Sequence, residues 1–69
     1  MMLLYAVIEV IRQAGHRIEA HHGTHTSISA EVEWTKPGSV IAVNYRNSDP
    51  EALAYELLND LLIHQARRP

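Results

Sequence analysis

Three of the five histidines of this chain lie in one short stretch. They are His21, His22 and His25, and they surround Gly23. A histidine titrates near neutral pH, so an imidazole on a loop can take a proton from a ribose 2′-hydroxyl and start cleavage of an RNA strand. A cation must also stabilise the charge that develops on the phosphate, and Arg17 and Arg46 are the candidates. These residue types therefore predict His25 as a catalytic base.

Two other interpretations of the same stretch stay open. Three neutral imidazoles can hold a zinc or nickel ion, but adjacent side chains on a strand point to opposite faces. His21 and His22 then cannot face one ion unless the turn begins before them, so we expect no metal and no other cofactor. Alternatively His25 is simply exposed in a polar turn, His22-Gly23-Thr24-His25, between two strands.

The length and composition indicate one folded domain over residues 1–69. A chain of 69 residues buries only ~60% of its unfolded surface, so the core is small. A hydrophobic content of 46% with 20% charged residues is typical of a globular protein and argues against disorder. The absence of cysteine excludes disulfides, thiolate zinc sites and thiol catalysis.

Charge and hydropathy narrow the range of partners. The net charge is -2 and Lys36 is the single lysine, whereas domains that grip nucleic acid through phosphates are usually basic. RNA stays a possible partner if the five arginines cluster in space. The longest apolar run, residues 1–8, is far shorter than the ~20 residues that span a bilayer, and no basic segment precedes it. We therefore expect a cytoplasmic protein without a membrane partner.

The first segment is predicted to form a helix that ends at Gly15. Five apolar residues fall on one helical stripe: Leu3, Leu4, Val7, Ile8 and Ile11. Four more lie off that stripe: Met2, Tyr5, Ala6 and Val10. A small monomer rarely leaves such apolar area in water, so we expect a homodimer, or another protein partner, packed through this helix.

The middle of the chain predicts three strands. Apolar and polar residues alternate over 17–21 and again over 28–34, and Lys36-Pro37-Gly38 supplies the next turn. The third strand, 40–45, is nearly all apolar, which predicts burial on one face and partial cover on the other. In the second strand we expect Trp34 in the core and Glu31 and Glu33 in water.

The last segment carries the strongest local signal. Ser48 or Asp49 can cap a helix, proline follows in the first turn, and Glu51 is placed to complete a capping box. Five leucines then recur at helical spacing: Leu53, Leu57, Leu58, Leu61 and Leu62. The predicted fold is α+β, a three-stranded antiparallel meander with two helices packed on one face, in the order αβββα.

Within residues 7 to 34 the chain resembles the HicA toxins, small ribonucleases of toxin and antitoxin pairs. The resemblance rests on Ala14-Gly15 at the helix end and on Gly23-Thr24-His25 after a short strand. It implies that His25 is catalytic, that Gly23 and Thr24 form the turn that presents it, and that cleavage needs no metal. The start of the last helix, with Ser48, Glu51 and Ala52, is also similar to double-stranded RNA-binding domains, although Asp49 and Pro50 replace their lysines.

Two functions follow from these observations. One is a regulatory, toxin–antitoxin or defence-related ribonuclease that uses His25. The other is a non-enzymatic interaction or inhibitor module of phage origin that presents an acidic last helix to a basic partner. That helix carries Asp49, Glu51, Glu56 and Asp60. A ribonuclease needs arginines beside His25, whereas an inhibitor needs carboxylates on one accessible face.

Overall fold

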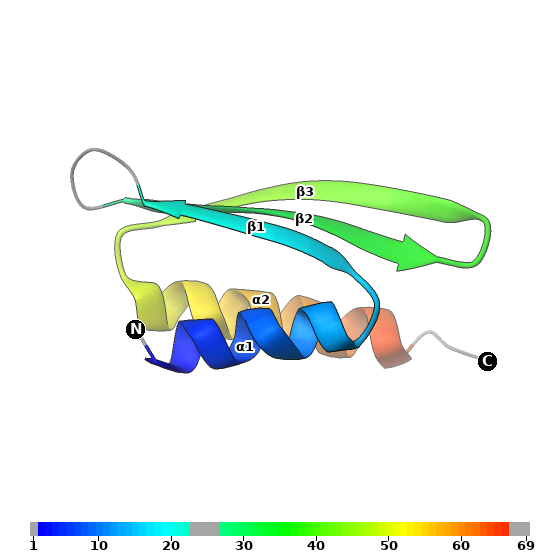
Figure 1. Cartoon of the computed structure of the whole chain (residues 1–69), viewed down its shortest axis with the longest axis horizontal. Coiled ribbons are helices and arrows are strands. Elements are labelled where there is room, and N and C mark those ends of the chain that lie inside the picture. Colours follow the sequence, from blue (N-terminus) through cyan, green and yellow to red (C-terminus); the bar gives the residue numbers. More distant parts are fainter. Residues whose placement is uncertain (1, 23–26, 67–69) are drawn as a thin grey trace.

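The chain folds in the predicted order of helix, three strands and helix (Figure 1). The computed structural model describes residues 2–22 and 27–66. The elements are α1 (Met2–Gln13), β1 (Arg17–His22), β2 (Ile28–Lys36), β3 (Ser39–Asn47) and α2 (Pro50–Ala66). None of the helices in these residues is long and apolar enough to cross a membrane.

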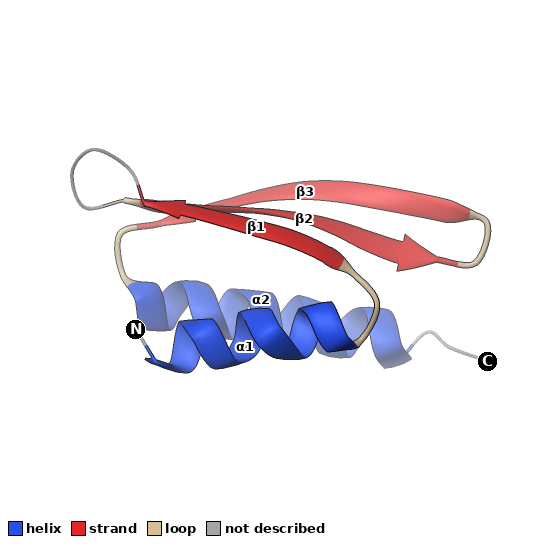
Figure 2. Ribbon diagram, viewed as in Figure 1, coloured by secondary structure: helices blue, strands red, loops and turns tan. Residues whose placement is uncertain are grey.

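The three strands form one antiparallel sheet in the order β1-β2-β3. Both helices lie side by side on the same face of this sheet, and the other face is open (Figure 2). This is the α+β meander that the sequence predicts. The turn between β2 and β3 contains Gly38 with φ +82°, a left-handed conformation that favours glycine.

The helix α1 buries the predicted stripe. Leu4, Val7, Ile8 and Ile11 are buried, and Leu3 packs against them. Gly15 follows the end of the helix, and its φ is +98°. The His16 N–H donates to the Ile11 carbonyl at 3.2 Å and the Gly15 N–H to the Arg12 carbonyl at 3.0 Å, which is the Schellman pattern of a glycine C-cap.

The strand β3 is far more exposed than its apolar sequence predicts. Val40 and Ala42 are exposed, so the partial cover expected for the outer face is wrong. On the inner face Tyr45 is buried and Val43 is half-buried, as expected, but Ile41 is exposed. Val40 and Ala42 lie opposite outward-facing residues of β2 and therefore point away from the helices. Ile41 faces the helix side but lies near the tip of the β2–β3 hairpin, which reaches past the ends of both helices (Figure 1).

The helix α2 is capped by Asp49. Its Oδ1 accepts the Glu51 N–H at 3.0 Å, and its carbonyl accepts the Leu53 N–H at 3.0 Å. Glu51 is then the second helical residue, one position too early for a capping box, so the predicted box does not form.

The leucine stripe of α2 is narrower than predicted. Leu53, Leu57 and Leu61 are buried and Leu58 is half-buried, but 57% of Leu62 is exposed. Successive residues of a helix are rotated by about 100°, so Leu62 lies on the flank of the helix and not against the sheet.

Trp34 lies in the core, as predicted, and is fully buried. Its indole Nε1–H donates to the Tyr45 hydroxyl at 3.0 Å, and this hydroxyl donates in turn to the carboxylate of Asp60. Burial, followed by the hydrogen bond to Asp60, raises the pKa of Tyr45. One hydroxyl therefore joins β2, β3 and α2.

Removal of this hydroxyl should destabilise the protein. In Tyr45→Phe the Trp34 N–H and the Asp60 carboxylate lose their shared partner, and a buried polar group without a partner costs about 1–3 kcal/mol. Urea unfolding measures the free energy. The matched control is Tyr55→Phe, at a tyrosine that is 61% exposed, and it should leave the stability unchanged. Equal stability of the two variants would contradict the structural role of the Tyr45 hydroxyl.

Candidate functional site

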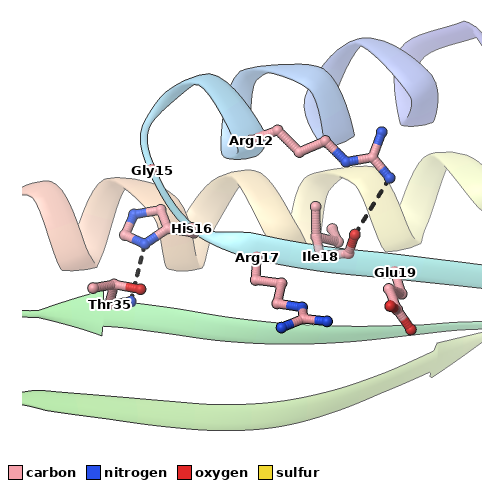
Figure 3. Close-up of a pocket in the computed structure, with 7 residues that line it drawn as sticks. All are labelled: Arg12, Gly15, His16, Arg17, Ile18, Glu19 and Thr35. Atoms are coloured by element: carbon pink, nitrogen blue, oxygen red, sulfur yellow. Dashed lines mark hydrogen bonds between the residues drawn. The ribbon is translucent and has the colours of Figure 1, made fainter.

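A hollow of about 440 Å³ opens where α1 ends and β1 begins (Figure 3). The glycine turn at Gly15 separates the helix from the strand and so brings side chains of both to one place. The hollow is lined by Arg12, Gly15, His16, Arg17, Ile18, Glu19 and Thr35. It combines one imidazole with two guanidinium groups and one carboxylate.

The imidazole of His16 is held by the structure and is not free to act as a base. Its Nδ1 accepts the backbone N–H of Thr35 at 3.0 Å, so the proton of the neutral ring lies on Nε2. Burial, followed by repulsion from His64, lowers the pKa of His16. A neutral imidazole has a single available lone pair, and Thr35 occupies it.

The two arginines of the hollow have different roles. The guanidinium of Arg12 donates to the Ile18 carbonyl at 3.3 Å and so ties α1 to β1 (Figure 3). Arg17 begins β1 and is exposed. Glu19 adds negative charge to the same hollow. The arrangement can bind a small polar group through Arg17, but the described residues supply it with no free imidazole.

The residues predicted for RNA cleavage are only partly within the described structure. Gly23, Thr24 and His25 lie outside the described residues. Arg46 lies in one cross-strand row with Ser29 and His21, at the end of the sheet where β1 leads into that segment. Arg17 lies at the opposite end of β1, about 17 Å along a strand of this length. The structure therefore places Arg46 at the end of the sheet where β1 finishes and Arg17 at the opposite end.

The open face of the sheet carries a group of carboxylates. Glu19 on β1 is directly opposite Glu31 on β2, and Glu33 follows two residues later on the same face. All three side chains are exposed, as predicted for Glu31 and Glu33. With Arg17, which is opposite Glu33, they line a shallow hollow of about 170 Å³.

The acidic residues of α2 are less available than the sequence suggests. Asp49 caps the helix, Asp60 accepts the Tyr45 hydroxyl, and Glu56 accepts the Asn47 side-chain amide at 3.3 Å. Among the four carboxylates of the predicted acidic surface, three thus have partners within the fold. Asp49, Glu51 and Glu56 nevertheless stay exposed, so the start of α2 and the open sheet face are two accessible acidic surfaces.

Sequence reasoning missed the histidines that pack on Trp34. His64 stacks on the indole at 4.8 Å between ring centroids, and His16 meets it edge-on at 5.1 Å. The Nδ1 of His64 is buried and has no hydrogen-bond partner among the described residues. In the same residues no group of three or more histidine, aspartate or glutamate side chains is placed to hold a metal. No local spacing signals this cluster, because its members come from the α1–β1 connection, β2 and α2.

Acid should weaken the fold through His16. Because its pKa is lowered in the folded protein, the unfolded chain takes up the proton first as the pH falls below the ordinary value near 6.5. The stabilisation is thus complete above that pH and is lost as the pH falls towards the lowered pKa. In His16→Asn the amide oxygen can still accept the Thr35 N–H but does not titrate, so unfolding between pH 7.5 and 5.5 should depend less on pH. His21→Asn, at an exposed histidine, is the control and should retain the wild-type dependence.

The chain was compared with family models, curated proteins and solved structures, and none of the three comparisons finds a match. The chemistry of its own surfaces is therefore the basis for a functional proposal.

Proposed function

We propose that this protein is an interaction module that binds a basic segment of a partner protein on the open face of its sheet. The observation that carries the proposal is the direct opposition of Glu19 and Glu31, with Glu33 beside them, on an exposed surface. Arg17 is the cationic neighbour of this group, and the His21 Nε2 atom lies 3.8 Å from Glu19 Oε1.

Like charges placed directly opposite each other destabilise a sheet, by about 0.2–1 kcal/mol relative to a neutral pair. The fold itself gains nothing from the Glu19–Glu31 pair, because both side chains point away from the core. A lysine- or arginine-rich segment laid across the face would relieve this repulsion. Complementary charge of this kind sets partner choice and the rate of association.

The same surface disfavours RNA as the ligand of this face. Phosphates carry the charge that dominates nucleic-acid binding, and they would be repelled by three carboxylates. The described residues contain eight acidic side chains but only four lysines and arginines: Arg12, Arg17, Lys36 and Arg46. The acidic residues outnumber the basic ones, so the described part of the chain is predominantly acidic.

The proposal predicts binding of a lysine-rich peptide that depends on the sheet carboxylates. In Glu19→Gln/Glu31→Gln the two opposed charges are removed with little change of shape. At about 0.15 M salt, where charges beyond about 8 Å are screened, the affinity should fall about tenfold in isothermal titration calorimetry. The same variant should unfold at higher urea concentration, because the repulsion between the strands is gone.

The control, Glu9→Gln/Glu51→Gln, makes the same change of net charge at two exposed helix residues. It should bind the peptide like the wild type. Equal loss of affinity in both double variants would mean that only net charge matters and would overturn the sheet face as a binding surface. A wild type that does not bind the peptide would do the same.

A HicA-like ribonuclease is the second candidate. It is favoured by the position of His21 and Arg46, which share one cross-strand row at the end of the sheet next to the segment that contains His25. In this proposal His25 takes the proton of the 2′-hydroxyl and Arg46 stabilises the charge on the phosphate.

Expression of the protein should then arrest growth and degrade RNA, and His25→Ala should remove both effects. Circular dichroism should show the same fold for the two proteins. Indistinguishable growth and RNA integrity in cells that express either protein would exclude this candidate, and would leave the interaction module in place.

A further inference from the structure

The strand β3 forms one edge of the sheet, and most of that edge is unprotected, because the one charged residue of the strand is Arg46, next to its end. An edge strand presents unpaired backbone N–H and C=O groups that can pair with another chain. Proteins usually block such edges with charges, proline or a bulge. From Ser39 to Tyr45 there is no charged residue and no proline, and the pairing with β2 runs without a bulge from Lys36↔Ser39 to Ile28↔Asn47.

Exposed apolar side chains gather along the same edge. Val40 is 57% exposed and Ile41 39% exposed. Two hydrogen bonds, Asn47 to Glu56 and Tyr45 to Asp60, join β3 to α2. They show which flank of α2 lies below β3.

Ile63 follows Glu56 by two helical turns and therefore lies on that flank. It is 44% exposed, farther along α2 towards the hairpin. The uncovered apolar surface thus extends from the strand edge to the helix beneath it.

The opposite edge of the sheet is protected. The strand β1 is shorter, six residues against nine, and carries Arg17, Glu19 and His21 on its open face. The guanidinium of Arg12 donates a hydrogen bond to the Ile18 carbonyl, so this acceptor on β1 already has a partner. The two edges of one small sheet therefore differ in chemistry, and only β3 is suited to pairing.

We propose that the β3 strands of two copies of this chain pair antiparallel about a two-fold axis near Ala42, and form a continuous six-stranded sheet. The two β1 strands, which are the protected ones, then become the outer edges of the dimer. The assembly is closed, because no unprotected edge remains for a third copy.

A second copy fits this edge better than a charged peptide does. The pairing surface is uncharged, so it offers a charged segment nothing complementary, whereas an identical strand brings the same uncharged surface. In pairing centred on Ala42, Val40 lies opposite Asn44 of the other copy, and Arg46 lies opposite Gly38. No like charges meet.

The same geometry suits the helices. A two-fold axis perpendicular to the sheet keeps both helix layers on one side and turns the Ile63 flank of each α2 towards the other. Asn47, which holds Glu56, is five residues or about 17 Å along the strand from Ala42. The Glu56 carboxylates of the two copies therefore stay far apart, while the Ile63 flanks of the two helices approach. This pairing does not depend on the basic partner proposed above.

Sedimentation equilibrium of the full chain tests the proposal with a matched pair of variants. Val40→Lys places a charge on the β3 edge, and Val10→Lys makes the same substitution at a residue of α1 that is 47% exposed. The wild type and Val10→Lys should dimerise at tens of micromolar, and Val40→Lys should weaken the dimer at least tenfold. A dimer lost in Val10→Lys but retained in Val40→Lys would place the interface on α1 and overturn the proposal, as would a monomeric wild type at high micromolar concentration.

Hydrogen exchange of the wild type tests the same interface without a substitution. The backbone amides on the outer edge of β3 should become more protected as the protein concentration rises through the dimerisation range, whereas those of β1 should not. Protection of β3 that is independent of concentration while the protein dimerises would overturn the proposal.

Discussion

The burial of Trp34 depends on one hydrogen bond, and much of the fold depends on that burial. An indole N–H without an acceptor could not be placed in the core at acceptable cost, and Tyr45 supplies the acceptor. The Tyr45 hydroxyl in turn needs an acceptor of its own, and Asp60 supplies it. This chain of donors fixes β2 against β3 and both against α2. His16 and His64 then pack on the indole, which brings the α1–β1 connection and the end of α2 to the same side chain.

The histidines of this core show how position decides chemistry. An imidazole acts as a base only through a free lone pair, and His16 uses its lone pair to accept the Thr35 N–H. Its burial favours the neutral form, which is the form that this hydrogen bond needs. His16 is therefore a structural residue, although it lies in a hollow beside two arginines.

Because both helices cover one face, the sheet keeps an open face and two edges, and these three surfaces differ in chemistry. The open face holds the carboxylates of Glu19, Glu31 and Glu33, which suits a basic ligand. One edge is shielded by charged residues and by Arg12, and the other has no charged residue from Ser39 to Tyr45. A chain of this length buries little apolar area in its own core. A partner that covers the exposed apolar residues of β3 and α2 would therefore add buried surface. An interaction module can use the face and the edge together, since they do not overlap.

The sequence by itself determined the order of the elements, the inward stripe of α1, the core position of Trp34 and the turn at Gly38. Each of these follows from local rules: the spacing of apolar residues, the preference of glycine for positive φ, and the few residue types that cap helices. The exposure of β3 was decided by tertiary structure. An apolar run has the same sequence pattern in a central strand and in an edge strand, and only the strand order and the lengths of the helices distinguish these two positions. The same holds for the acidic surface. Periodicity placed Glu31 and Glu33 in water, but the strand register set Glu19 opposite Glu31, and long-range contacts drew Asp60 and Glu56 into hydrogen bonds. Side-chain partners that are far apart in the chain leave no local pattern, and for this reason the histidine pair on Trp34 is visible only in the folded protein.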